Sequence, residues 1–581
     1  MRSAAAWMLA GLGILVAGAS PVSGNGGRAV AADSDAGTEA VDGNGGAAAA
    51  NGNGAAVSPN GDGGTPAASE LTETDLAALR VYEGVLQLFS LEPAALWPGY
   101  DLARQPFIAY LPERWAILFN GPQRAEGFSP PPAGWPDLWP SMQVCLGQYR
   151  DLAGQLVLDL PLDSLRIAAV PYQGRSAAEE VAFLVHEAFH QYQAAAFGEI
   201  GWEREEKYPI EDRENTALAV LEARLLIDAL NAAAEVATRD ACLRQFAAVR
   251  DHRWRRGDDY LRTYEQGQEV NEGTAKYVEV MGVERMSALR YASRGQAAVA
   301  SGHRDGNAPL PAAPGVRSAR EALSDAFHDL ISGGSISPED MPRNRIYLVA
   351  CAQALLLDDL GAEWKPAAQH AGPDFTFAGF MRERLGSGGP GDSPSVSGAE
   401  NASDAAGAAL GDALPAAMAR YGYEEILAAT DASIRAHREG FEQELRLFDA
   451  QPGCRVELEL SGRGLTRSRS STATKWLVDQ GARELRNHFD IYSLKGADLE
   501  LQVKDTGILE ENDWASRDKR IVFHAPETPA ISTDGRTIGP PSGEIAAFDS
   551  LRMEGSGIHL LCHRPGTLRV EADRIAIDLT P

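Results

Sequence analysis

The spacing of hydrophobic residues changes once, at Gln451-Pro452-Gly453. The parts of the chain before and after this point therefore favour different types of secondary structure. Before that point apolar residues recur at spacings of three and four, which is typical of amphipathic helices. After it apolar and polar residues alternate, and Gly and Pro turns are frequent. Alternation with a period of two is typical of half-buried strands. The sequence therefore predicts an α+β chain, with a mainly helical region over 70–450 and an all-β, sandwich-like region over 453–581.

Short apolar runs separated by Pro and Gly precede the main helical segments. Three of them cover residues 106–110, 115–119 and 166–171. Runs of this length between turn residues are typical of strands, so we expect a small sheet here. An edge strand of such a sheet can bind an extended substrate by main-chain pairing, or serve only as scaffold. Two stretches rich in small residues, 295–315 and 386–411, are expected to be flexible insertions.

The N-terminus has the composition of an export signal followed by a spacer. An apolar run from Ala4 to Ala19 has the length of a signal-peptide core and is short for a membrane span. Small residues at its end offer a cleavage site, so we predict a signal peptide over 1–19, with an uncleaved anchor as the alternative. Residues 20–69 hold almost no large apolar side chain and are expected to be a disordered spacer. A secreted or periplasmic location follows, with no stable membrane span after cleavage.

The charge balance and the cysteines limit the class of partner. A formal net charge of -28 speaks against nucleic acid and anionic membrane surfaces as partners, because both require basic patches. Five cysteines in 581 residues are too few for a disulfide scaffold. Cys454 and Cys562 fall near the two ends of the β region, and we hypothesise that they form a disulfide in an oxidising compartment.

The segment from Ala177 to Phe197 carries the motif with the clearest chemistry. It reads His-Glu-Ala-Phe-His over residues 186–190, inside a run whose apolar spacing predicts a helix. Residues four apart on a helix lie one above the other, so His186 and His190 project from one stripe. Two imidazoles at this spacing can share a tetrahedral Zn²⁺, and the Glu after the first reaches toward the metal-bound water. The motif is short, so the assignment needs a third ligand.

Four glutamates within one predicted helix further along the chain, over about 258–281, are candidates for that ligand, and composition alone does not choose among them: Glu265, Glu269, Glu272 and Glu279. The text Asn-Glu-Gly-Thr-Ala-Lys-Tyr over residues 271–277 resembles the Asn-Glu-Gly-x-Ala-x-Tyr element of the gluzincin zinc metallopeptidases. The resemblance implies that Glu272 is the third zinc ligand. Glu222, on an intervening predicted helix, is the alternative ligand.

The resemblance also has limits that bear on specificity. In the gluzincin aminopeptidases the ligand Glu lies much closer to the His-Glu-x-x-His motif than Glu272 does here. The chain also lacks their Gly-x-Met-Glu-Asn element. What the resemblance implies is a zincin-like metallohydrolase domain over 70–450, without an aminopeptidase specificity.

In such a site the mechanism assigns a role to the residue between the two histidines. Zn²⁺ lowers the pKa of a water in its fourth position to about 7. Glu187 is then predicted to accept the proton of that water and pass it to the leaving amine. Charge that develops on the carbonyl oxygen needs a donor. Tyr347 is the predicted donor, with Tyr277 and Tyr192 as alternatives.

The ligand histidines also need acceptors for their second ring nitrogens. Glu222, Asn215 and Glu214 are the candidates that the sequence offers. The remaining histidines, among them His252, His328 and His370, occur singly and are expected to lie at the surface or in satisfied core positions.

We therefore expect a secreted or periplasmic zinc metallohydrolase, a peptidase acting on a peptide or protein substrate. Two other readings stay open. One is a binding protein on a zincin scaffold that acts through its β region without turnover. The other is a zinc amidase or esterase with a non-peptide substrate, because the chemistry is the same.

Overall fold

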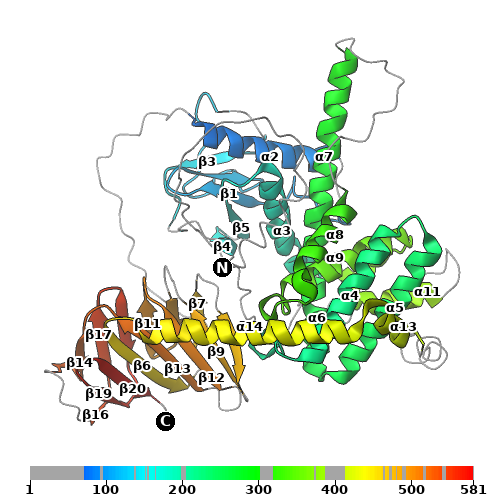
Figure 1. The fold of residues 1–581 in the computed structure, drawn as a ribbon. Coiled ribbons are helices and arrows are strands. Elements are labelled where there is room, and N and C mark those ends of the chain that lie inside the picture. The colour runs from blue at the N-terminus through cyan, green and yellow to red at the C-terminus, as the bar shows by residue number, and fades with distance from the viewer. Residues whose placement is uncertain are drawn as a thin grey trace, which may run out of the picture.

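The computed structural model describes residues 71–579 apart from 301–317, 387–411 and several shorter gaps. Within these residues the chain is a mixed α+β structure with most of its strands in the C-terminal part (Figure 1). The order predicted from the change of hydrophobic period is confirmed. The predicted signal peptide and spacer, 1–19 and 20–69, lie outside the described residues.

The first elements are a helix and a five-stranded sheet, and all three runs predicted to be strands are confirmed. The sheet order is β3-β2-β1-β5-β4, in which β1 and β5 are parallel and the other pairs antiparallel. The bounds are α2 (Glu73–Leu91), β1 (Phe107–Leu111), β2 (Trp115–Phe119), β3 (Gln143–Leu146), β4 (Val157–Leu162), β5 (Leu165–Pro171) and α3 (Ala177–Ala196).

Both faces of this sheet are buried, which explains why its strands read as continuous apolar runs. Phe107, Ala109 and Ile117 belong to the main core, which also contains residues of α2 and α3. Their neighbours, such as Ile108 and Leu118, form a second, smaller core on the opposite face. The sheet therefore provides a rigid support for α3, the helix that carries the two histidines.

The helices that follow build the rest of the first region, and they pack on the main core. The sequence predicted one helix over about 258–281, but the structure interrupts it with a π-helical turn, η2. Helix α7 then extends to Ala300, beyond the start of the loop expected at 295. The bounds are α4 (Arg213–Asn231), α5 (Val236–Arg256), α6 (Asp259–Gln268), η2 (Glu269–Gly273), α7 (Thr274–Ala300), α8 (Ala319–Leu330), α9 (Asn344–Asp359), α10 (Trp364–Ala371), α11 (Phe377–Gly386), α13 (Ala413–Tyr421) and α14 (Tyr423–Asp449).

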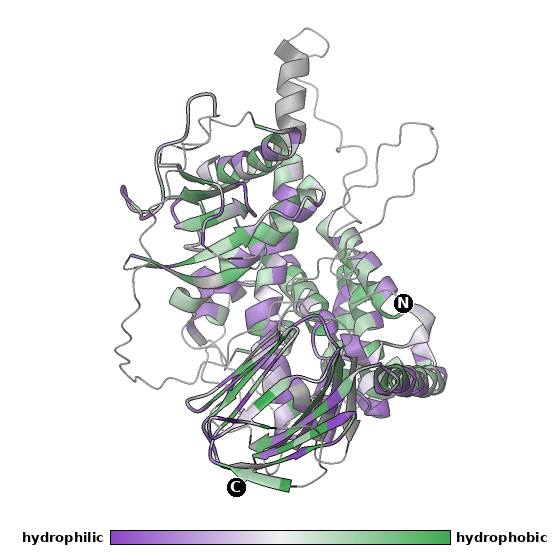
Figure 2. Cartoon of the chain, turned by 90° about the vertical axis from the view of Figure 1, so that its left-hand side faces the viewer, coloured by the Kyte–Doolittle hydropathy of each residue, from purple (hydrophilic) through white to green (hydrophobic). Residues whose placement is uncertain are grey.

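The C-terminal part contains two sheets with one hydrophobic core between them. A seven-stranded sheet has the order β15-β14-β17-β18-β11-β10-β7, and an eight-stranded sheet has the order β16-β19-β20-β6-β13-β12-β9-β8. Residues of both sheets, such as Leu501 and Leu458, share the core, and hydrophilic and hydrophobic residues alternate along the strands (Figure 2). This arrangement is sandwich-like, as predicted. The bounds are β6 (Cys454–Ser461), β7 (Thr466–Arg469), β8 (Thr474–Val478), β9 (Gly481–Arg486), β10 (Tyr492–Lys495), β11 (Leu499–Val503), β12 (Ile508–Asp513), β13 (Asp518–Ala525), β14 (Ala530–Thr533), β15 (Arg536–Thr537), β16 (Ile545–Phe548), β17 (Leu551–Gly555), β18 (Ile558–Cys562), β19 (Gly566–Val570) and β20 (Arg574–Leu579).

The hypothesis of a Cys454–Cys562 disulfide is wrong in this structure. Both residues are buried, and both are free thiols. Cys454 begins β6 of the eight-stranded sheet, whereas Cys562 ends β18 of the seven-stranded sheet. The two cysteines are therefore near the ends of the β region in sequence, but they belong to opposite sheets.

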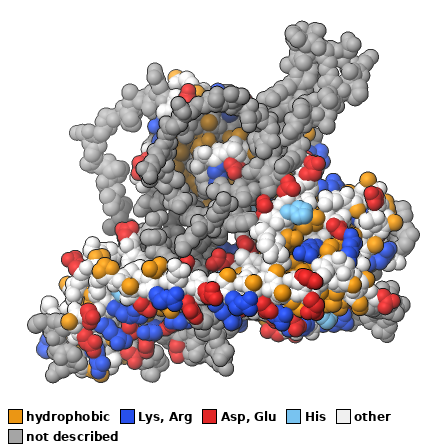
Figure 3. Space-filling model, in the orientation of Figure 1, with side chains coloured by type: hydrophobic (Ala, Val, Ile, Leu, Met, Phe, Trp, Pro, Cys, Tyr) orange, Lys and Arg blue, Asp and Glu red, His pale blue; other side chains and the backbone are white. Residues whose placement is uncertain are grey.

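Helix α14 runs from the helical region to the β sheets (Figure 1). Its early part packs along α4, and its late part contacts β8 and β9. On the face seen in Figure 3, positive and negative side chains alternate along it, which is typical of a solvated helix surface. Within the part of the chain that the structure describes, no helix has the length and apolarity needed to cross a bilayer.

Candidate metal centre

Helix α3 begins with a complete capping box that fixes its first turn. The hydroxyl of Ser176 accepts the backbone N–H of Glu179, and the Glu179 carboxylate accepts the N–H of Ser176 at 2.8 Å. The helix then packs along α7. His186 and His190 project from the same stripe, as predicted, and each imidazole is 12% exposed. Both can therefore be reached from solvent while they are held by the core on either side.

The structure brings Glu272 to these two histidines. Its Oε2 lies 3.4 Å from Nε2 of His186 and 3.4 Å from Nε2 of His190, and the two Nε2 atoms are 3.1 Å apart. Ligand atoms about 2.1 Å from a tetrahedral Zn²⁺ would lie about 3.4 Å from one another. The three side chains therefore already stand at the separations that a shared tetrahedral ion requires. Among the described residues they form the one group of His, Cys, Asp and Glu side chains close enough to hold a metal ion.

The second ring nitrogen of each histidine faces a hydrogen-bond acceptor. Nδ1 of His186 lies 3.1 Å from a carboxylate oxygen of Glu279, and Nδ1 of His190 lies 2.7 Å from Oε1 of Gln193. The Gln193 amide cannot be reversed without loss, because its Nε2 donates to Asn271 O at 2.7 Å. These acceptors favour a proton on each Nδ1, which leaves the two Nε2 atoms facing each other as the nitrogens able to bind a cation.

Three acceptor atoms thus converge on one point where a cation is the fitting occupant. Burial opposes protonation of His186, but hydrogen bonds to Glu272 and Glu279 raise its pKa to about 10. Burial also disfavours the Glu272 carboxylate, yet the two histidines hold its pKa below its usual value. The point between the three atoms therefore attracts positive charge, which a proton or a divalent ion could supply.

The π-helical turn η2 carries Glu272, and local packing explains why it has this sequence. A Cβ added at Gly273 would lie 2.1 Å from the Cβ of Ala350, so only glycine lets η2 pack this closely on α9. The Gln193 amide ties the same turn to α3, because its Nε2 lies 3.3 Å from Val270 O as well as contacting Asn271 O. Packing and hydrogen bonding therefore explain the Asn-Glu-Gly sequence of this turn independently of any family resemblance.

Glu187 lies beside this group and has an unused oxygen. The residue is 5% exposed, and its buried Oε2 has no hydrogen-bond partner among the described residues. Burial raises the pKa of Glu187, and the neighbouring His186 and His190 partly offset this effect. A carboxylate whose pKa is shifted toward neutrality, with an unsatisfied oxygen next to a cation site, has the properties of a general base.

Tyr347 lies in the first turn of α9 and is partly exposed. Burial raises its pKa well above the usual value, and the charges of Glu272 and Glu187 act in the same direction. Tyr347 therefore lies within electrostatic range of both carboxylates. Because its pKa is raised, the hydroxyl stays protonated and able to donate. The two alternatives are engaged elsewhere: the Tyr277 hydroxyl bonds Asp358 at 2.6 Å and that of Tyr192 bonds Pro98 O at 2.7 Å.

The sequence-based choice of acceptors for the imidazoles was wrong. Glu222 and Asn215 belong to a separate buried network of arginines, and Glu214 is half exposed and paired with Arg256. The same network engages Glu222, which therefore does not ligate with the histidines. Gln193 and Glu279 are the acceptors instead, and sequence spacing could have predicted both. Gln193 lies three residues after His190, and Glu279 lies seven residues after Glu272, on the same helical face.

No family model, no curated protein and no solved structure matches this chain. The interpretation of the site therefore depends on its own residues and their geometry.

Proposed function

We propose that this chain is a zinc-dependent hydrolase of gluzincin type, and that it acts as a peptidase on a peptide or protein substrate. The observation that carries the proposal is the convergence of His186 Nε2, His190 Nε2 and Glu272 Oε2 at 3.1–3.4 Å, with both imidazoles oriented by acceptors at Nδ1. In line with the N-terminal sequence, we propose that it acts outside the cytoplasm, in the periplasm or after secretion.

The chemistry divides between the ion and the side chains. When bound, the metal ion would supply Lewis acidity and a fixed position for the reacting carbonyl and water. Glu187 takes one proton from the attacking water at Oε2, and the water oxygen forms a bond to the carbonyl carbon. Tyr347 donates a hydrogen bond to the carbonyl oxygen as negative charge develops there. Glu187 then delivers its proton to the leaving nitrogen as the C–N bond breaks, which restores the carboxylate.

Glu187 supports turnover over simple metal binding. Its Oε2 has no partner among the described residues, and the carboxylate interacts electrostatically with His186 and His190, so it is placed to exchange a proton at the site. A zinc amidase or esterase uses the same arrangement, so the substrate class needs its own test.

The test compares wild type with Glu187→Gln on a denatured protein and a peptide library, with and without chelator. We expect zinc at one equivalent in both proteins and chelator-sensitive cleavage by wild type alone. Because a general base contributes about 10²–10⁴-fold, the loss in Glu187→Gln should be at least of that size. Glu83→Gln makes the same change at an exposed position of α2 and should cleave like wild type.

Three results would contradict parts of this proposal. Wild type without bound zinc removes the metal centre. Bound zinc with no turnover of peptides, amides or esters indicates a binding protein. Chelator-sensitive turnover confined to small amides or esters keeps the hydrolase and removes the peptidase.

A further inference from the structure

Four glutamates of the α6–η2–α7 segment divide between two buried sites, although their spacing suits one helix face. Successive residues on an α-helix are about 100° apart. At that angle, spacings of 4, 7 and 14 residues from Glu265 would bring Glu269, Glu272 and Glu279 within about 40° of it. The structure instead directs Glu265 and Glu269 to arginines, and Glu272 and Glu279 to the histidines of α3.

The π turn accounts for this division. A π-helical turn closes five residues instead of four, so everything after it lags by one position. One position corresponds to a rotation of about 100°. Glu272, near the end of the π turn, and Glu279, beyond it, are thereby moved off the face that Glu265 occupies and onto the face that meets α3. If the segment relaxed to a plain α-helix, either Glu269 or Glu272 would lose its present partners.

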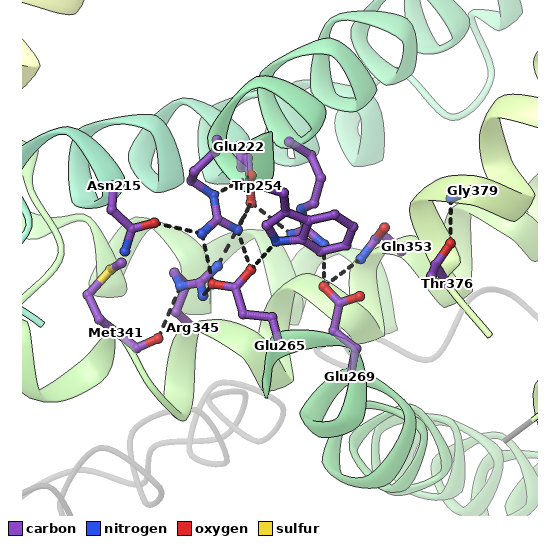
Figure 4. A network of polar contacts seen from close by, with 12 residues as sticks. Asn215, Glu222, Trp254, Glu265, Glu269, Met341, Arg345, Gln353, Thr376 and Gly379 are labelled. Carbon is purple, nitrogen blue, oxygen red and sulfur yellow. Dashed lines mark hydrogen bonds and ion pairs between the residues drawn. The ribbon is translucent and has the colours of Figure 1, made fainter. Parts of the chain in front are cut away.

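The upstream face is held by a buried cage of ion pairs, which we define as Arg250, Arg253, Arg345, Glu222, Glu265 and Glu269. Figure 4 labels Arg345 and the three glutamates of this cage. The six charged side chains of the cage are each at most 2% exposed. Three positive and three negative groups meet there, so the cage is electrically balanced when all are ionised.

Two members of the cage fix successive turns of the segment. Glu265 accepts from Arg253, from Arg345, from the Tyr208 hydroxyl at 2.6 Å and from the Trp254 indole at 2.7 Å. Glu269, the first residue of η2, accepts from Arg250, and the Gln353 amide lies 3.3 Å from the same oxygen. Arg250 is itself held at 2.8 Å by Glu222 of α4.

The downstream face is fixed independently by the contacts described above. Gln193 holds the carbonyls of Val270 and Asn271, and Gly273 packs on Ala350. Between the two sets of contacts the chain has one residue more than an α-helix would use. The extra residue is accommodated as η2.

We propose that Arg250 is a positioning residue for the metal centre, acting through Glu269. Its ion pair fixes the first residue of η2, and this fixes the register that brings Glu272 to the histidines three residues later. The inference rests on the metal site proposed above. Buried ion pairs often add little to stability when compared with apolar residues of similar volume, so a role in setting one register is a use that stability alone does not explain.

The test replaces the pair by apolar side chains of similar size, Arg250→Met with Glu269→Leu. Apo-protein is titrated with Co²⁺, whose visible absorption reports the geometry of its ligands, and with Zn²⁺. Stability is measured separately by urea unfolding. We expect a folded double variant whose affinity for both ions falls about 10–100-fold, the range seen when residues that orient ligands are removed, and whose Co²⁺ spectrum departs from that of wild type.

A second variant and a matched control keep the result decisive. Glu269→Gln retains the shape and one acceptor, and it should lower metal affinity less than the double change. Asp75→Leu with Arg114→Met removes another ion pair with a buried carboxylate, between α2 and the β1–β2 turn, and should leave affinity and spectrum as in wild type.

The outcomes separate this inference from the proposed function. If wild type binds neither ion, the metal centre itself is wrong. If wild type binds and the folded Arg250→Met, Glu269→Leu and Glu269→Gln proteins bind with unchanged affinity and spectrum, only the positioning role is overturned. If the double variant does not fold, Glu269→Gln alone decides: reduced affinity supports the proposal, and unchanged affinity overturns it.

Discussion

The two sides of η2 contain similar acidic residues and differ in what faces them. In the cage, Glu265 and Glu222 each accept from guanidinium groups, and the charges cancel. At the candidate metal centre, Glu272 meets two ring nitrogens whose lone pairs point at the same spot. Acceptors there outnumber donors.

This difference separates two uses of a buried carboxylate. Where arginine balances it, the carboxylate holds helices together and has no electrostatic need for a ligand. Where acceptors converge without a donor, burial is favourable only with an added cation. Substitutions in the cage should therefore lower mainly the free energy of unfolding. Substitutions at the candidate metal centre should lower mainly metal binding or turnover.

Removing an arginine of the cage should give the largest change, a loss of stability. Arg253→Met removes one buried guanidinium from Glu222, Glu265 and Asn215, and it leaves three carboxylates facing two arginines in the cage. Loss of one partner of a buried ion pair costs about 3–5 kcal/mol, so the free energy of unfolding in urea should fall by that amount. Arg256→Met, one turn away on α5, removes partly exposed pairs with Asp212 and Glu214 and should cost about 1 kcal/mol or less. Equal losses of unfolding free energy in the two variants would contradict the structural role of the cage.

On the metal side, Tyr347→Phe should lower kcat and leave the unfolding free energy and zinc content nearly unchanged. Loss of one donor to a developing oxyanion costs about 10²–10³-fold in kcat. Tyr277→Phe is the matched control, because its hydroxyl is bonded to Asp358 and not to the site. The comparison is measured by steady-state kinetics on the peptide identified for wild type. A kcat within twofold of wild type for Tyr347→Phe would remove this residue from the mechanism.

The smallest change is expected in the pH dependence of stability, through the protonation of Glu265 in acid. Burial raises the pKa of Glu265, but Arg253 and Arg345 outweigh it and hold that pKa well below the usual value. A group with a lowered folded pKa contributes stability above its unfolded pKa, about 4.5, and loses that contribution as the pH falls further. In metal-free protein with chelator present, unfolding free energy should therefore decrease below about pH 4.5. Glu265→Gln should show a shallower decrease, and an unchanged slope would exclude Glu265 as a contributor.

Much of the fold was readable because local spacing determines it. The change of period at 451–453 separated helical from β sequence, and the four-residue spacing of His186 and His190 required one helix face. The aromatic and aliphatic runs at 106–110 and 115–119 predicted strands because turn residues bound them. Glu272 was chosen from its neighbours in sequence, and the structure brings it to the histidines.

The features that were missed depend on contacts between distant segments. The sequence around Glu222 does not show whether it joins the cage or binds a metal, because its partners, Arg250 and Arg253, come from another helix. The π turn has no sequence period of its own. It results from constraints on both sides of η2, of which the contact between Gly273 and Ala350 is one. The Cys454–Cys562 hypothesis failed for the same reason, since the distance and orientation of two side chains far apart in sequence are set by long-range packing.

Helix α14 has a consequence for any attempt to divide the chain. Phe441 and Phe448 near its end are fully buried against Leu485, Leu509 and Val522 of the eight-stranded sheet. A cut at 450–453 follows the change in sequence pattern, yet it would strip one hydrophobic interface from both fragments. The cooperative unit extends past the apparent boundary, so a soluble fragment of the sheets should include the second half of α14.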